Sequence, residues 1–320
     1  MARAAKRFLV ALTVIGVVCA PLPYIDADGL LPLVQATLPV VGLLGTLVAL
    51  AALATRMPLT ALVAALAAGA LLVPALPLTP RPAVPEATAH GSDVTVLALN
   101  AEYGQADPSE VVDAVRSLDV DVLVLTEATP DFWRALGTHD IAALLPHATG
   151  VANPTASGTI VLTREAVTCL DPRLDCGEVA QDVRPLDEPF HQVDVRLGNG
   201  TVLRGAHPFP PTPGRGALWR VSMNRLHTFV HDTHGGAPLI VAGDLNAGPV
   251  HPVFRGVMDG LVQAPRRLPW QPTWPREASI PPFVQIDHVL ARGYAVADEG
   301  VVHVGGTDHA GVWARLRPTG

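Results

Sequence analysis

Residues 8–78 hold almost no charge, and this limits the possible fold more than any other feature of the chain. Asp26, Asp28 and Arg56 are the only charged residues in this segment, although the whole chain carries a net charge of −7. An apolar stretch of about 20 residues is long enough to cross a bilayer as a helix. Three such stretches occur, at about 8–23, 30–54 and 59–78. We therefore predict a membrane anchor of three transmembrane helices over residues 1–78.

The first apolar stretch, taken alone, also fits a signal peptide, because three basic residues precede it within the first seven positions. Two further stretches and a poor cleavage or lipobox site at 17–20 favour an uncleaved anchor instead. Short loops rich in Lys and Arg stay in the cytoplasm. The N-terminus and the turn at Arg56 are basic, whereas the loop at 25–29 is not. Three crossings then place the C-terminal region outside, and we expect a multi-pass protein of a cytoplasmic membrane.

A proline-rich segment separates the anchor from the rest of the chain. Residues 74–85 hold five prolines, and such a segment favours an extended, stiff tether. We place the linker at 79–91 and one catalytic domain at 92–320, which is long enough to bury a sizeable core. The acidic balance and the lack of a basic, aromatic-rich run in this domain make nucleic acid an unlikely partner.

Cys169 and Cys176 are near neighbours in a polar loop of the predicted catalytic domain. A compartment outside the cytoplasm permits a disulfide between them. The alternative is two unpaired surface thiols. A zinc site is not expected, because no CxxC motif or pair of histidines accompanies them.

Two strands joined by one helix open the catalytic domain. Residues 93–99 are apolar on both faces, as in a strand packed between two layers, and end at Asn100. Residues 107–110 then supply an acid, a proline and a glutamate that suit the start of a helix. The strand at 120–126 ends at Glu127. A right-handed crossover makes the two strands parallel and brings Asn100 and Glu127 to the same edge.

Further strands are predicted downstream, at 158–163, 190–197 and 201–206. We interpret the first two as antiparallel. The third follows a tight turn at Asn199-Gly200 and delivers His207. A helix is predicted at 216–232 from its apolar spacing. The Pro- and Trp-rich segment 262–282 is predicted to be an irregular loop at the rim of the site.

Acids and amides recur where apolar runs end. Asp244 and Asn246 directly follow the buried run 238–242, so both side chains project from the C-terminal edge of a strand. Asp287 stands beside another apolar stretch, and Asp308 and His309 precede a third. Any one of these groups could be structural; Asp244 and Asn246, for example, would also fit an Asx-turn. Their shared placement at strand ends favours a catalytic set.

This set of side chains suits phosphoester hydrolysis. The phosphate oxygens need a hard cation, and oxygen ligands suit Mg²⁺, which Glu127 and Asp308 could hold. A base must take a proton from water, and His309 with Asp287 fits that role because the acid sets the tautomer of the imidazole. Charge developing on the phosphate needs donors, for which Asn246 and His207 are candidates.

The ordered motifs resemble the endonuclease/exonuclease/phosphatase superfamily, the DNase I-like fold, over about residues 92–316. The resemblance implies an α/β protein, a four-layer α/β/β/α sandwich of two mixed sheets, with Mg²⁺ or Mn²⁺ as cofactor. It also implies metal binding by Asn100, Glu127 and Asp308, and a catalytic set of His207, Asp244, Asn246, Asp287 and His309. Some relatives carry a second carboxylate where Glu102 stands.

Two further features bear on the branch of this superfamily. The acid that supports the first histidine in nucleases has no clear counterpart, and Arg164 occupies roughly that region. Three membrane helices before such a domain resemble the membrane-anchored, VanJ-like bacterial branch associated with glycopeptide resistance.

We therefore expect an extracytoplasmic, metal-dependent phosphohydrolase that cleaves phosphoester or pyrophosphate bonds. A site tethered near the bilayer favours a lipid-linked substrate of the cell envelope. A membrane-anchored extracellular nuclease or phosphodiesterase is the alternative, disfavoured because phosphate backbones attract clusters of Lys and Arg. A non-catalytic membrane binding protein on the same fold is a second alternative, disfavoured by the complete set of acids and histidines.

Overall fold

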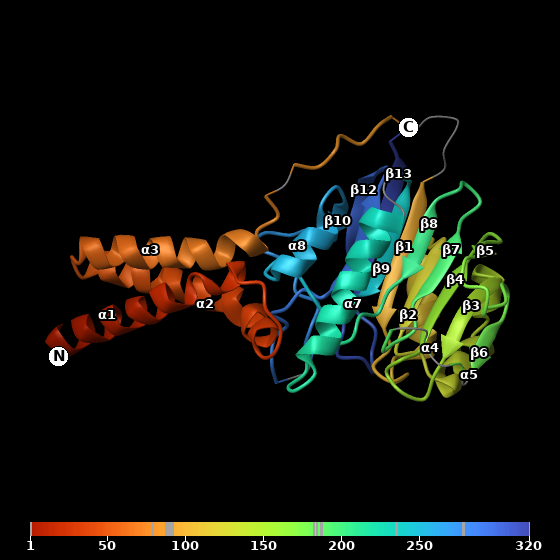
Figure 1. The fold of residues 1–320 in the computed structure, drawn as a ribbon, viewed down its shortest axis with the longest axis horizontal. Coiled ribbons are helices and arrows are strands. Elements are labelled where there is room, and N and C mark those ends of the chain that lie inside the picture. Colours follow the sequence, from red (N-terminus) through yellow and green to blue (C-terminus); the bar gives the residue numbers. More distant parts are fainter. Residues whose placement is uncertain are drawn as a thin grey trace.

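The protein consists of an elongated three-helix anchor and a domain of two β-sheets (Figure 1). The computed structural model describes residues 2–78, 80–86, 93–181, 183, 185, 188–233, 236–276 and 279–319. The predicted start of the catalytic domain, at residue 92, lies outside the described residues, as do positions 79 and 87–91 of the predicted linker.

The anchor contains the three helices that the apolar stretches predict. They are α1 (Ala2–Cys19), α2 (Leu31–Ala54) and α3 (Pro58–Leu72), with short 3₁₀ turns at Leu22–Tyr24 and Val73–Ala75. By length and composition, all three can cross a membrane. Small residues let them pack closely: a Cβ on Gly42 would come within 2.7 Å of Leu72 Cγ.

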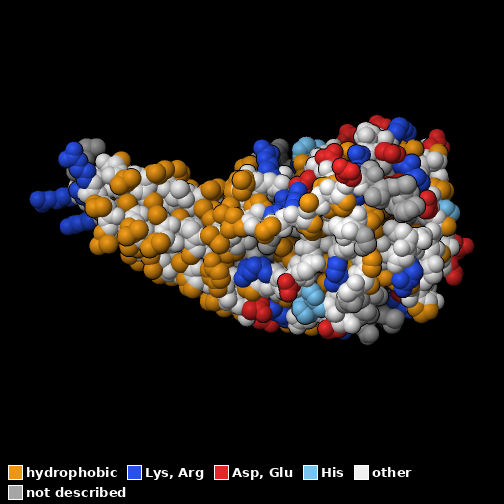
Figure 2. Space-filling view, turned by 90° about the horizontal axis from the view of Figure 1, so that it is seen from above, with side chains coloured by type: hydrophobic (Ala, Val, Ile, Leu, Met, Phe, Trp, Pro, Cys, Tyr) orange, Lys and Arg blue, Asp and Glu red, His pale blue; other side chains and the backbone are white. Residues whose placement is uncertain are grey.

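The basic residues of the anchor gather at the end far from the two sheets. Figure 2 shows a cluster of Lys and Arg at that tip and a band of apolar side chains between the tip and the domain. The N-terminus lies at the same tip (Figure 1). Loops rich in Lys and Arg remain in the cytoplasm, so this separation bears directly on the orientation of the protein in the membrane.

Two mixed sheets form the core of the domain. The seven-stranded sheet has the order β12-β13-β1-β2-β4-β3-β6 and the six-stranded sheet the order β10-β11-β9-β8-β7-β5. The strands of the first are β1 (Val94–Asn100), β2 (Val122–Thr126), β3 (His147–Ala152), β4 (Thr159–Thr163), β6 (Val179–Gln181), β12 (Tyr294–Val302) and β13 (Gly311–Pro318). Those of the second are β5 (Thr168–Cys169), β7 (Val193–Arg196), β8 (Val202–Gly205), β9 (Leu239–Asp244), β10 (Val262–Ala264) and β11 (Asp287–Arg292).

Helices cover the outer face of each sheet, which gives the four layers expected from the sequence. The first sheet is covered by α4 (Pro108–Ser117), α5 (Pro130–Thr138) and α6 (Ile141–Leu144), and the second by α7 (Gly216–Thr228) and α8 (Pro252–Met258). Between the sheets lies a core that includes Val96, Val124, Ile240 and Val289, each at most 1% exposed. Burial of these side chains from both sheets holds the two sheets face to face.

The structure confirms the predicted opening of the domain. Strands β1 and β2 are parallel, with Asn100 beside Thr126. The side chain of Asp107 caps α4 by accepting hydrogen bonds from the backbone N–H groups of Ser109 and Glu110. The crossover therefore brings the ends of β1 and β2 to one edge.

Other predictions were only partly right. Strands β4 and β7 are each antiparallel to their neighbours but belong to different sheets. The segment predicted to be an irregular loop begins with β10, because three of its residues pair with β11. Helix α7 ends at Thr228 and continues as one π turn over Phe229–Thr233. Strand β3 was not predicted, since its sequence His-Ala-Thr-Gly-Val-Ala has little apolar alternation.

The three-helix segment is docked on the domain of two sheets by specific polar contacts. The guanidinium of Arg255 in α8 donates to the carbonyl of Pro23 at 2.9 Å. Arg220 in α7 forms an ion pair with Asp26, in the loop before α2. These contacts join α7 and α8 to the end of the anchor that faces the domain.

The proline-rich segment also packs on the domain and is not simply a free tether. Arg81 donates to the carbonyl of Gln263 at 3.1 Å and forms an ion pair with Glu299. Arg317 in β13 donates to the carbonyl of Pro85 at 3.0 Å. The described part of the linker is thus tied to β10, β12 and β13.

Candidate active site

Polar residues from both sheets meet at one edge of the sandwich. Asn100 ends β1 and Glu127 follows β2, while Asp244 ends β9. Asp287 begins β11 and lies directly opposite Asp244 in the antiparallel pair. Parallel and antiparallel pairing therefore deliver carboxylates from the two sheets to the same place.

Asn100 connects the carboxylates of the two sheets. Its side-chain N–H₂ donates to Glu127 Oε1 at 3.1 Å and to Asp244 Oδ2 at 3.0 Å. Its side-chain oxygen accepts a hydrogen bond from the backbone N–H of Glu102 at 2.8 Å. Asn100 is 1% exposed. In this arrangement the amide orients Glu127 and Asp244 and turns its oxygen away from them.

Four non-glycine residues of the site have a left-handed backbone. The φ angles are +47° at Glu102, +53° at Tyr103, +55° at Glu127 and +47° at Asn246. Such conformations cost about 1 kcal/mol or more each and persist where surrounding contacts support them. Here they aim backbone N–H groups at carboxylates: Tyr103 donates to Glu127 Oε2 at 3.1 Å, and Asn246 to Asp244 Oδ1 at 2.9 Å.

His309 and Asp287 form a buried dyad. Nδ1 of His309 lies 3.1 and 3.0 Å from the two carboxylate oxygens of Asp287, and the residues are 6% and 1% exposed. Nε2 of His309 lies 3.8 Å from Asp244 Oδ2. Burial alone would lower the pKa of His309, but the charges of Asp287 and Asp244 outweigh it and raise this pKa to about 10. His309 is therefore a cation at neutral pH in this arrangement.

His207, in contrast to His309, is neutral at neutral pH in this arrangement. Its Nε2 lies 3.7 Å from Asp244 Oδ2 and 3.9 Å from Glu127 Oε1, and the residue is 1% exposed. Burial, together with the positive charge of His309, lowers the pKa of His207 to about 3. Two contacts from the backbone of His207 to Gln192 fix its position, because the Gln192 side chain accepts from the N–H and donates to the carbonyl, both at 2.8 Å.

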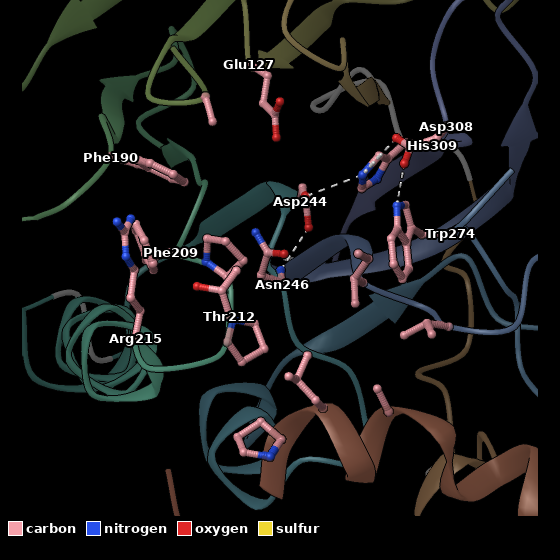
Figure 3. Close-up of a pocket in the computed structure, with 18 of the residues that line it drawn as sticks. Glu127, Phe190, Phe209, Thr212, Arg215, Asp244, Asn246, Trp274, Asp308 and His309 are labelled. Atoms are coloured by element: carbon pink, nitrogen blue, oxygen red, sulfur yellow. Dashed lines mark hydrogen bonds and ion pairs between the residues drawn. The ribbon is translucent and has the colours of Figure 1, made fainter. Parts of the chain in front are cut away.

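Asp308 lies beside His309 and is held by the loop at 273–276 (Figure 3). The indole N–H of Trp274 donates to Asp308 Oδ2 at 2.7 Å. The backbone N–H of Asp308 donates to Glu102 Oε2 at 2.6 Å, and its Oδ1 is 3.6 Å from His309 Nε2. Asp308 thus connects the dyad to Glu102, the second carboxylate considered from the sequence.

Among the described residues, one group of three acidic and histidine side chains lies close enough together to hold a cation. Asp244, Asp287 and His309 can bring one ligand atom each within 4.8 Å of the others. In that group, however, both oxygens of Asp287 already contact Nδ1 of His309. A further difficulty is that His309 is protonated in this arrangement, and a histidine must be neutral to bind a metal.

Glu102, Glu127 and Asp308 line one cavity, and their oxygen-only side chains suit a hard divalent cation better. Glu127, burial, Asp308 and Glu102 together raise the pKa of Tyr103, which shows how much negative charge is concentrated there. Burial also raises the pKa of Glu127. Among the described residues no Lys or Arg pairs with Glu127, so a cation would stabilise its charged form.

These groups open into a cavity of about 600 Å³ (Figure 3). Glu102, Glu127, Asp244, Asp308 and His309 line it on the side of the sheets. Aromatic and proline side chains form much of the rest. The first turns of α2 close another side, as the orange-brown helix in Figure 3 shows.

The predicted site residues stand as follows. Seven of the eight, Asn100, Glu127, His207, Asp244, Asn246, Asp287 and His309, lie within one hydrogen-bonded or ion-pair-distance network, and Asp308 joins it through His309. Cys169 and Cys176 form a disulfide. Arg164 was expected near His207, but it pairs with Asp119 and Asp121 before the start of β2, at the opposite end of that strand from Glu127.

Sequence reasoning missed several residues of the site. Trp274 and Gln192 hold Asp308 and His207, and Tyr103 donates to Glu127. His251 is 1% exposed, and its Nε2 lies 3.0 Å from the carbonyl oxygen of Pro32 in α2. No local motif marks these residues, although Tyr103 could have been noticed three positions after Asn100.

The sequence and the fold were compared with those of known proteins. Residues 97–309 match the profile of the Endonuclease/Exonuclease/phosphatase family. No curated protein matches the sequence. Among solved structures, a Bacteroides vulgatus endonuclease/exonuclease/phosphatase is similar with a TM-score of 0.51 at 15% identity, covering 71% of this chain and 100% of that one. A humanised D. rerio TDP2 is similar with a TM-score of 0.52 at 15% identity and the same coverage. At these identities the structural likeness concerns the fold alone.

Proposed function

Because the chain belongs to the Endonuclease/Exonuclease/phosphatase family, whose profile spans most of it, we propose that it is a membrane-anchored, divalent-cation-dependent phosphohydrolase. Its substrate is a phosphoester or pyrophosphate carried by a lipid of the cell envelope. One observation carries the proposal: residues of α2 and the acids and histidine of the candidate active site line the same cavity.

Asp244 is the proposed base that takes a proton from the attacking water. Burial and the nearby charge of Asp287 raise the pKa of Asp244, which brings its basicity closer to that needed at neutral pH. Asn100 and the backbone N–H of Asn246 each donate to this carboxylate. These two donors fix the direction in which Asp244 meets the water.

His309 is the proposed cationic donor to the phosphate. The sequence suggested His309 as the base, but a histidine whose pKa is about 10 already holds its proton at neutral pH. Asp287 engages Nδ1, so Nε2 carries the proton that faces the cavity. His309 can stabilise charge on a phosphate oxygen and pass this proton to the leaving group. His207, which is neutral, supplies an uncharged ring nitrogen on the other side of Asp244.

Glu127 and Asp308, with Glu102 beside them, are the residues proposed to hold Mg²⁺ or Mn²⁺. When bound, such a cation neutralises charge on phosphate oxygens and orients the substrate. Oxygen-only side chains at a partly buried, negatively charged position suit these two hard ions. Asn100 supports this position by holding Glu127 in place.

The catalytic domain is proposed to lie outside the cytoplasm. The basic residues of the anchor lie at the tip far from the domain (Figure 2), and basic ends of short segments remain in the cytoplasm. The disulfide between Cys169 and Cys176 suits an oxidising compartment. Both observations support the same orientation by independent physical arguments.

The test uses purified full-length protein in detergent micelles. Phosphate release would be measured from a prenyl pyrophosphate, and cleavage from a sphingomyelin-type phosphodiester and from DNA, each with EDTA and then with added Mg²⁺ or Mn²⁺. We expect metal-dependent hydrolysis of the lipid pyrophosphate and little cleavage of DNA. Rapid cutting of DNA with no action on the lipid would favour the nuclease alternative. No hydrolysis of any substrate by a folded, metal-loaded protein would favour a binding protein.

A further inference from the structure

We propose that the first turns of α2 are part of the substrate site and hold the apolar tail of an amphiphilic phosphate next to the bond that is cleaved. This inference rests on the proposed phosphohydrolase function and deepens it. The anchor would then act in two ways, because it both keeps the enzyme at the membrane and forms one wall of the catalytic cavity.

Residues of α2 share a cavity with the proposed catalytic residues. Pro32, Leu33 and Ala36 line the same space of about 600 Å³ as Asp244 and His309. Leu33 is 38% exposed, so an apolar surface remains available there within a folded protein. A phosphate alone gains nothing from that surface, whereas a hydrocarbon chain attached to the phosphate does.

The opposite wall of the cavity is apolar as well. Phe190 and Phe209 lie on the side of the cavity away from Asp308 and His309 (Figure 3), and the prolines at 210, 211 and 213 line the same cavity. Phe190 packs against Phe209 with ring centroids 5.0 Å apart. These apolar surfaces, with acids and a histidine lining the same cavity, match a ligand with an anionic head and an apolar tail.

The position of α2 in this wall is fixed by direct contacts. His251 is fully inside the protein, and its Nε2 lies 3.0 Å from the carbonyl oxygen of Pro32. Nδ1 of His251 accepts a hydrogen bond from the N–H of Gly248 at 3.0 Å, so Nε2 carries the proton that is donated to Pro32. Pro32 lies in the first turn of α2, and its carbonyl oxygen has two lone pairs, so it can accept this bond in addition to one within the helix. The catalytic domain therefore contacts Pro32, which lines the cavity, as well as parts of the anchor outside the cavity.

The direction of α2 gives the tail a path into the bilayer. The helix begins at the cavity and runs away from the domain through the apolar band of the anchor (Figures 1 and 2). Leu30, at 61% exposed, and Leu33 begin this apolar surface. A tail that starts at the phosphate can follow α2 without leaving apolar surroundings.

The test varies the tail and keeps the head constant. Full-length protein in detergent micelles would be assayed with dimethylallyl, geranyl and farnesyl pyrophosphate, which carry the same headgroup on one, two or three isoprene units. Leu33→Trp fills the proposed tail position. Leu43→Trp is the matched control, because Leu43 lies on the same helix, is 42% exposed and does not line the cavity. Ala36→Leu is a second, milder variant for use if Leu33→Trp does not fold.

In the wild type we expect kcat/KM to rise at least about tenfold from dimethylallyl to farnesyl pyrophosphate, since each buried methylene is worth roughly fourfold. Leu33→Trp should lower kcat/KM much more for farnesyl than for dimethylallyl pyrophosphate and so remove most of this rise, whereas Leu43→Trp should retain it. Equal rates on all three substrates in the wild type would overturn the tail site but preserve the hydrolase. So would equal effects of Leu33→Trp on the shortest and longest substrates. A wild-type protein that cleaves DNA and none of the pyrophosphates would overturn the proposed function itself.

Discussion

Asp287→Asn tests how the buried dyad sets the protonation of the site. The substitution keeps the size of the side chain and removes its charge. Asp287 raises the pKa of both His309 and Asp244. Loss of its charge should therefore lower both pKa values, in contrast to a substitution that only disturbs packing.

The magnitude follows from the burial of the pair. Asp287 and His309 are 1% and 6% exposed and their closest atoms are 3.0 Å apart. Removing one partner of such a buried pair costs about 3–5 kcal/mol. Since one pKa unit corresponds to about 1.36 kcal/mol, the pKa of His309 should fall by about two to four units. From about 10 in the wild type, it would reach the region of neutral pH.

The assay is a pH profile of kcat/KM on one soluble phosphoester with saturating Mg²⁺. If activity needs protonated His309 and ionised Asp244, both limbs of the profile should move to lower pH in Asp287→Asn. At pH 8 the rate should fall by roughly 10²-fold, as is usual for loss of a proton-transfer group, and recover in part at lower pH. Asp298→Asn, an exposed acid of β12, is the control. If Asp287→Asn shows both limbs of the pH profile at the wild-type pH and a near-normal rate, Asp287 does not set the protonation of His309 and Asp244.

Three other predictions follow from described features. Glu127→Gln should raise the Mg²⁺ concentration needed for half-maximal activity after EDTA treatment by at least about tenfold, and an unchanged titration would remove the proposed metal position. Gly243→Ala should lower thermal stability in detergent by several kcal/mol, since φ is +145° and the new Cβ would lie 2.0 Å from the carbonyl oxygen of Ala206; an unchanged melting temperature would contradict this. Alkaline phosphatase fused after Gly320 should be active and a fluorescent protein fused there dark, and the reverse pattern would invert the orientation.

The sequence predicted those parts of the site that local patterns encode. Strand ends revealed Asn100, Glu127 and Asp244, because an apolar run that stops at a polar residue is visible within a few positions. The same reasoning predicted the parallel pairing of β1 and β2. It assigned strand β4 and strand β7 to no particular sheet, since an alternation of apolar residues does not say which neighbour a strand will pair with.

Contacts between segments far apart in the sequence have no local sequence pattern that predicts them. His251 and Pro32 are 219 positions apart, and neither stands in a motif. The proline-rich stretch was interpreted as a tether because composition reports stiffness, whereas the bond from Arg317 to Pro85 depends on the folded domain. The sequence also did not predict that His309 is protonated at neutral pH, because its pKa is raised by Asp287 and Asp244, which lie on other strands.

The hydrogen bond between His251 and Pro32 has a consequence for how the protein matures. It joins the start of α2, a helix long and apolar enough to cross a bilayer, to a domain synthesised much later in the chain. A nascent polypeptide whose first helices have not been inserted cannot assemble this contact in its native setting. The cavity would therefore be completed only after insertion and folding have both succeeded. Such an order of events would keep a hydrolase of phosphate compounds idle during biosynthesis and make correct delivery to the membrane the step that activates it.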